Sequence, residues 1–138
     1  MKTGFEDAFT DIQSGMVSLC LEYAGEDTDR IFIYAYQTEG VRMFNAFFDK
    51  GGQIAAAGQI ASDELSDEFM AAGREDIKKI TDICAEYDHK APNEMRLTYD
   101  VNTHKFDAQY GYENYSLKNK TTPMTEFLNW YRKEKTNK

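Results

Sequence analysis

The chain has 138 residues, of which 41% are apolar and 14% aromatic, and 24 acidic against 16 basic side chains give it a formal net charge of −8. We expect one domain over residues 1–138, large enough to bury roughly two-thirds of its unfolded surface. Nine Gly, two Pro and two Cys exclude collagen-like, disulfide-framework and low-complexity classes. No apolar run reaches the roughly 20 residues of a membrane helix, and the acidic N-terminus is unlike a signal peptide. These features predict a soluble, cytoplasmic protein.

The charge is unevenly distributed along the chain. Residues 1–100 hold 20 acidic and 9 basic side chains, a net of −11, whereas residues 101–138 hold 4 and 7, a net of +3. We interpret residues 132–138 as a basic tail after a final helix, where cations complement the helix dipole. The overall acidity argues against binding to nucleic acid or to an anionic membrane, because phosphate contacts need Lys and Arg.

The first half of the chain predicts a helix and three strands. Apolar residues at spacings of three and four predict an amphipathic helix over residues 5–24. Residues 30–36 are apolar at both alternating positions, which predicts a strand buried on one face and at least half covered on the other. Residues 41–48 predict the returning strand, with a bulge where the apolar phase slips between Met43 and Phe44. Residues 53–58 predict a weaker third strand.

The second half predicts a helix, a hairpin and a last helix. Helical spacing returns over residues 62–87, with Ser62 or Ser66 as the cap and with Gly73 as a point where the helix could divide. Residues 94–112 alternate around a short turn, which predicts an antiparallel hairpin with one apolar and one wet face. Residues 122–134 predict a short amphipathic helix that begins at a proline.

This order, α-β-β-β-α-β-β-α, predicts the α+β class. Strands grouped in runs pair antiparallel, so we expect a single five-stranded, mainly antiparallel sheet. The one-sided hairpin leads us to expect all helices on one face of that sheet.

Groups for catalysis are scarce. His89 and His104 stand in polar connections, with no nearby cysteine or second histidine at metal-ligand spacing, and are interpreted as solvated surface histidines. Cys20 and Cys84 stand on apolar helix stripes and are interpreted as buried free thiols. We therefore expect no enzyme and assign no catalytic, cofactor-binding or metal-binding residue.

Two groups of acidic residues are candidates for binding a partner. Both stand at the ends of predicted elements, where loops project side chains outwards. The candidates are Glu26, Asp27 and Asp29 beside the first strand, and Asp63, Glu64, Asp67 and Glu68 at the start of the middle helix. The alternative interpretation is a solvated turn and ordinary acids at a helix start.

Aromatic residues allow a second kind of surface. Tyr and Trp are enriched at interfaces, but they also commonly bury the ring and leave the polar atom wet, so core packing stays open as the alternative. The residues in question are Tyr34, Tyr36, Tyr110, Tyr112, Tyr115 and Trp130.

A resemblance to a known family adds to these expectations. Residues 92–101 (PNEMRLTYDV) and 105–112 (KFDAQYGY) resemble the P-x-E-x-[KR]-L-x-Y-D … K-x-x-A-x-Y-x-Y hairpin of the YezG-like immunity proteins. Residues 11–23, 29–34 and 75–80 resemble the same family. The resemblance implies a small bacterial cytoplasmic protein, encoded beside a polymorphic toxin, that binds the toxin's C-terminal domain, often a nuclease. It carries over no catalytic or contact residue.

The expected function is therefore that of a non-enzymatic immunity protein that binds and neutralises a toxin domain with a basic surface. The expected oligomeric state is a monomer or a weak homodimer. One alternative is a small ligand-binding domain or hydrolase whose acidic residues are brought together by the fold. A self-assembling structural module is a third class, and a large apolar symmetric interface would indicate it.

Overall fold

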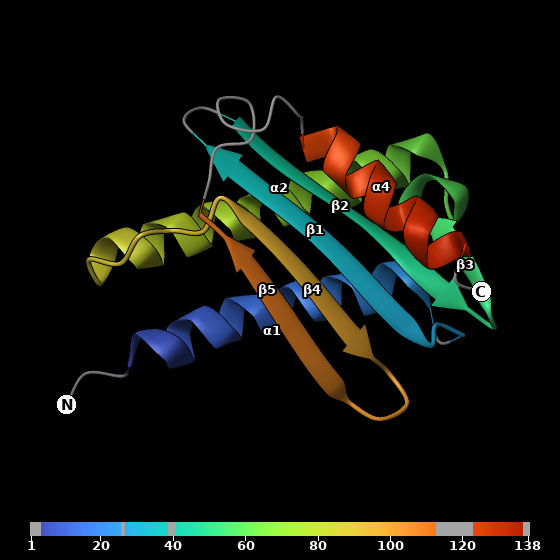
Figure 1. Ribbon diagram of the computed structural model, residues 1–138, viewed down its shortest axis with the longest axis horizontal. Helices are drawn as coiled ribbons and strands as arrows, with labels where there is room; N and C mark the ends of the chain where they lie inside the picture. The colour runs from blue at the N-terminus through green and yellow to red at the C-terminus, as the bar shows by residue number, and fades with distance from the viewer. Residues whose placement is uncertain (1–3, 26, 39–40, 113–122, 137–138) are drawn as a thin grey trace.

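A computed structural model describes residues 4–25, 27–38, 41–112 and 123–136 (Figure 1). It confirms the α+β class and the predicted order of elements. These elements are α1 (Phe5–Ala24), β1 (Arg30–Thr38), β2 (Val41–Lys50), β3 (Gln53–Ala56), a 3-10 turn η1 (Ala57–Gln59), α2 (Asp63–Glu86), β4 (Glu94–Asp100), β5 (Lys105–Gly111) and α4 (Pro123–Thr136). The third strand ends at Ala56, earlier than predicted, and the predicted basic tail is helical as far as Thr136.

The five strands form one antiparallel sheet in the order β3-β2-β1-β4-β5. The central strand β1 pairs with β2 without interruption, from Arg30 opposite Asp49 to Thr38 opposite Val41. The predicted bulge between Met43 and Phe44 is therefore wrong. The apolar phase slips because both faces of β2 are covered, so that Phe47 packs on one face and Phe48 on the other.

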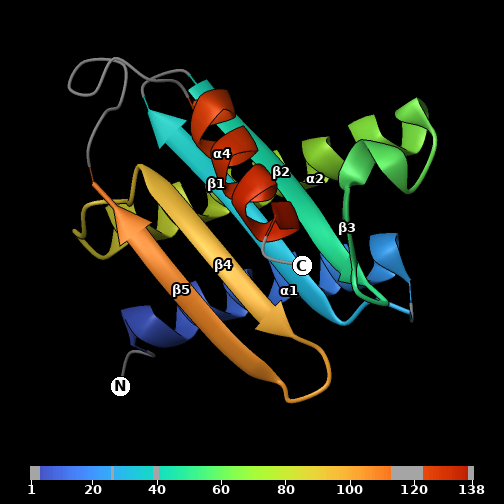
Figure 2. The same ribbon diagram turned by 45° about the vertical axis from the view of Figure 1, so that its right-hand side comes forward.

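The helices lie on both faces of the sheet, which corrects the prediction of one covered face. Helices α1 and α2 cover one face and α4 lies across the other (Figures 1 and 2). We call these the α1–α2 face and the α4 face. The reason is the double-sided apolar pattern of β1, where alternating residues enter two separate cores. Ile31, Ile33 and Ala35 pack beneath α1 and α2, whereas Phe32, Tyr34 and Tyr36 pack beneath α4.

Helix α2 continues without a break through Gly73, and at this position it packs against the ring of Phe44. A Cβ atom at Gly73 would lie 2.1 Å from that ring. Gly73 is therefore a contact point between α2 and the sheet, and it does not divide the helix. Among the described helices, none combines the length and the apolar character that crossing a bilayer requires.

Candidate functional site

The first two turns of α2 carry four carboxylates that project into solvent. Ser62 caps the helix by accepting a hydrogen bond from the Leu65 N–H at 3.3 Å, as predicted. The side chains that follow the cap and point outwards are those of Asp63, Glu64, Asp67 and Glu68. None of the four forms an ion pair with any residue that the structure describes. The structure thus brings together four of the seven predicted acidic residues, and no described side chain neutralises them.

A fifth carboxylate comes from α1. The rings of Tyr23 and Phe69 stack at 4.2 Å, which brings the end of α1 against the start of α2. Beside this pair, Glu22 and Glu68 line a shallow depression of about 330 Å³. Leu65 lines it too and is 53% exposed. We call Glu22, Asp63, Glu64, Asp67 and Glu68, together with Leu65, the α2 acidic face.

Sequence reasoning missed two members of this face. Glu22 stands in the last turn of α1, where the helix dipole disfavours a negative charge. Leu65 is a large apolar residue that lies outside the buried apolar stripe of α2, and its side chain is therefore exposed to solvent. Either departure from helix rules could have marked the site.

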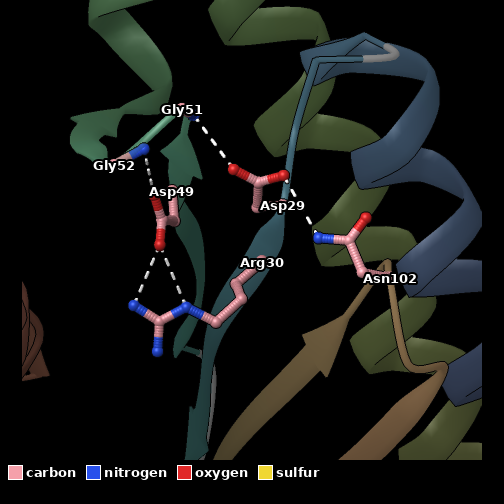
Figure 3. Close-up of polar contacts among 6 residues, drawn as sticks. All are labelled: Asp29, Arg30, Asp49, Gly51, Gly52 and Asn102. Carbon is pink, nitrogen blue, oxygen red and sulfur yellow. Dashed lines mark hydrogen bonds and ion pairs between the residues drawn. The ribbon is translucent and has the colours of Figure 1, made fainter.

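The second predicted acidic group lies at the start of β1 and is engaged by the fold. Asp27 pairs with Lys50 at 2.6 Å, and the hydrogen bond from the lysine lowers the pKa of Asp27. Lys50 also donates to the carbonyl of Ala24. Asp29 accepts hydrogen bonds from the Gly51 N–H at 3.1 Å and from Asn102 Nδ2 at 3.3 Å (Figure 3). Glu26 lies outside the described residues.

A neighbouring carboxylate completes this structural cluster. Asp49 is 3% exposed and receives Arg30 Nε at 3.0 Å and the Gly52 N–H at 3.0 Å (Figure 3). Gly51 and Gly52 both adopt positive φ, which suits glycine in so tight a turn. Asp29 and Asp49 together join the start of β1 to the β2–β3 turn and, through Asn102, to the β4–β5 turn. We therefore assign Asp29 a structural role, while Asp27 is exposed but charge-compensated.

Two carboxylates from distant positions in the sequence, one on β4 and one on α4, also meet at Arg96. Tyr34 Oη donates to Glu94 Oε2 at 2.6 Å, and Arg96 Nη2 reaches Glu94 at 3.2 Å and Glu126 at 3.1 Å. The guanidinium also lies over the ring of Trp130. Glu94, predicted on the solvent-exposed face, is 7% exposed and accepts the hydrogen bond of the buried Tyr34 hydroxyl. Both carboxylates share one arginine, so the arrangement is suited to holding α4 on the sheet rather than to acid–base chemistry.

The histidines and cysteines are placed largely as expected. His89 and His104 are exposed, but each contacts a ring, since His89 stacks on Phe5 at 4.1 Å and Tyr99 Oη lies 2.9 Å from His104 Nδ1. Cys20 and Cys84 are free and buried, and burial raises the pKa of both thiols. Within the described part of the chain, no three His, Cys, Asp or Glu side chains are placed to share a metal ion.

The aromatic candidates divide between core and surface. Tyr34 and Tyr36 are buried, and Trp130 packs against Phe47 at 5.0 Å between ring centroids. Tyr110 and Tyr112 are more than two-fifths exposed. Tyr115 lies outside the described residues. Among the described aromatic candidates, those exposed enough for an interface are the two at the end of β5.

Comparison with models of known protein families and with curated protein sequences finds no match for this chain. The resemblance to the YezG-like immunity proteins thus stays a prediction. Any assignment of function has to stand on the geometry described above.

Proposed function

We propose that this chain is a non-enzymatic immunity protein that binds a basic toxin domain through the α2 acidic face. The observation that carries the proposal is a group of carboxylates without ion-pair partners among the described residues. They surround an exposed leucine at the ends of two packed helices. Basic patches on nucleases serve to bind nucleic acid, and an acidic protein that covers such a patch blocks access to the substrate.

Ordinary helix capping explains only part of this face. The dipole of α2 stabilises carboxylates in its first turn, so Asp63 and Glu64 are accounted for. The effect fades beyond that turn, so Asp67 and Glu68 gain little from it. Glu22 stands at the unfavourable end of α1. The charge that the dipole leaves unexplained is what a basic partner would stabilise.

The depression suggests how a partner is held after the first encounter. Charges at the rim of an interface mainly steer association, whereas a desolvated apolar contact at its centre slows dissociation. Leu65, between Glu64 and Glu68 on the same helix, is placed for that second role. The fitting partner surface therefore has Lys and Arg around an apolar side chain.

The first test measures binding to the C-terminal domain of a toxin encoded beside this chain's gene. Asp67→Lys combined with Glu68→Lys should slow association by about tenfold or more at low salt, and added salt should remove most of that difference. The matched control is Asp7→Lys with Asp11→Lys, which changes the net charge equally at exposed positions near the start of α1. Tight binding that ignores both salt and the Asp67/Glu68 reversal would refute the acidic-face mechanism.

Leu65→Ala separates the two roles of the face. We expect faster dissociation by about tenfold with little change in the association rate. Stoichiometry tests the non-enzymatic part of the proposal, since inhibition should be complete only near one chain per toxin domain. Lasting inactivation of the toxin by a small fraction of an equivalent would show an enzyme instead.

A further inference from the structure

The edge strand β5 is open to solvent along its whole length. It has seven residues and none of them is buried. The opposite edge strand, β3, has four residues and contacts α4. An edge strand presents a row of N–H and C=O groups that can pair with another strand. The long edge strand β5 is therefore available for pairing along its whole length.

The side chains of β5 are suited to an interface. Phe106, Ala108 and Tyr110 point to the α1–α2 face, and Phe106 and Tyr110 are 40% and 43% exposed. Tyr110 is held in place, because Gln13 Nε2 donates to its hydroxyl at 2.8 Å and its ring meets Phe9 edge-on. Residues 101–112 carry one Lys and one Asp, a net charge of zero in an otherwise acidic chain.

We propose that two copies of this chain pair through β5, antiparallel, around a two-fold axis at Ala108. This Ala108 register places Ala108 opposite its own copy and Phe106 opposite Tyr110 of the second copy. On the α4 face it places Asp107 opposite Gln109, whose amide can donate to the carboxylate. Directly opposite partners of these kinds stabilise a sheet, and every residue of β5 finds a partner.

The neighbouring symmetric registers of the two β5 strands would pair less stably. A two-fold axis at Asp107 would set two aspartates directly opposite each other, which destabilises strand pairing. An axis at Gln109 would leave Lys105 and Phe106 without partners in the strand. The self-complementary Ala108 register is the reason we favour a second copy over a strand from another protein.

Helix α1 adds a second contact. Its N-terminal half extends past β5 in both views (Figures 1 and 2). In the pair, the α1 helix of each copy would therefore lie beneath the strands of the other. Between α1 and β5 is a mainly apolar groove of about 340 Å³, lined by Val17, Tyr99 and Phe106 among others. This groove can receive side chains of the second α1, which matters because a stable interface buries roughly 800 Å² per partner, more than one strand pair supplies.

The dimer and the α2 acidic face are compatible but independent. The start of α2 lies near η1 and the β3 edge, whereas β5 is the opposite edge of the sheet (Figure 2). Pairing through β5 therefore leaves both acidic faces exposed. Dimerisation can be measured on the full chain alone, so the outcome does not depend on any toxin.

Cysteine cross-linking tests the register. Paired residues on adjacent strands have Cα atoms close enough for a disulfide, so Ala108→Cys should yield a cross-linked dimer under mild oxidation. The matched control is Asp107→Cys, because residue 107 is diagonal to its own copy and out of reach. The native cysteines, Cys20 and Cys84, are buried and should not compete. Equal cross-linking of both variants would refute the Ala108 register.

Sedimentation across a concentration series tests the pairing itself. The wild-type chain should approach twice 15.9 kDa as its concentration rises. Gln109→Asp places a carboxylate opposite Asp107 in both halves, so dimerisation should weaken by about tenfold. Adding Asp107→Lys to Gln109→Asp should restore it. Gln53→Asp, the same change on the exposed β3 edge, is the control.

Two results would overturn the proposal. One is a chain that stays at 15.9 kDa at all concentrations while Ala108→Cys fails to cross-link. The other is dimerisation that Gln53→Asp weakens as much as Gln109→Asp does. Pairing of β5 only with a strand of a toxin domain would appear as the first of these results in the isolated chain.

Discussion

On the α1–α2 face, two helices cover the sheet with a continuous apolar core, and Gly73 of α2 lies directly against Phe44. On the α4 face, a single helix covers a smaller core and is held at its margin by Arg96 between Glu94 and Glu126. The first face depends on close packing and the second on packing plus ion pairs. The two faces should therefore fail differently when a single residue is changed.

The largest effect is expected at the α2–sheet contact. Gly73→Ala introduces a Cβ atom 2.1 Å from the buried Phe44 ring, so the helix or the ring must move. We expect a loss of about 3 kcal/mol in the free energy of unfolding, measured with urea. Gly15→Ala in α1 is the matched control, since nothing lies within 4 Å of its Cβ position. That change should stabilise by about 1 kcal/mol, and a loss of similar size at both positions would contradict the packing argument.

The next effect is expected beneath α4. Glu94→Ala removes the acceptor of the Tyr34 hydroxyl and the inner partner of Arg96, and should cost about 2 kcal/mol. Glu126→Ala removes the more exposed partner of the same arginine and should cost only about 0.5 kcal/mol.

The only tryptophan reports on this face alone. Trp130 lies on α4 against Phe32 and Phe47, so its fluorescence follows the docking of α4. In Glu94→Ala the fluorescence transition should precede the loss of far-UV circular dichroism, whereas in Gly73→Ala the two should coincide. Coincident transitions in both variants would show that the two faces unfold as one unit.

The smallest effect concerns Asp76 of α2. Burial raises the pKa of Asp76, although Lys79 at 3.6 Å partly opposes the shift. The folded chain therefore binds a proton more tightly than the unfolded chain, so this group lowers stability as pH rises from the ordinary to the raised pKa. Asp76→Asn should remove that part of the pH dependence. At neutral pH it should add less than about 1 kcal/mol, measured by urea unfolding from pH 4 to 7. A variant with an unchanged pH profile would contradict this assignment.

Helices and strands were predictable from the sequence where one periodicity of apolar residues dominates the segment. The helix at residues 5–24 and the alternation that begins at residue 94 follow one periodicity each, and both are confirmed. The covering of the second face was not predicted, although residues 30–36 already carry apolar side chains on both sides. The prediction extended the solvent-exposed face of the hairpin to the whole sheet. In the structure, α4 packs over part of that face, and Glu94 on the same side is buried.

The candidate site was predictable only in its local part. Acids in the first turns of α2 stand next to one another in sequence, and their exposure follows from helix geometry. The engagement of Asp29 could not be predicted, because its partners Gly51 and Asn102 reach it through two separate turns. Glu22 joins the α2 acids only because α1 and α2 pack together at Tyr23 and Phe69.

The position of β1 in the sheet also has a consequence for the order of folding. The strands β1, β2 and β3 follow one another along the chain and can pair as soon as they are synthesised. The other edge of β1 pairs with β4, which lies much later in the chain, as the sequence separation of 60 between Tyr34 and Glu94 shows. During that interval an apolar strand has a free edge next to the growing chain. Arrival of the β4–β5 hairpin is thus the step that pairs this free edge of β1.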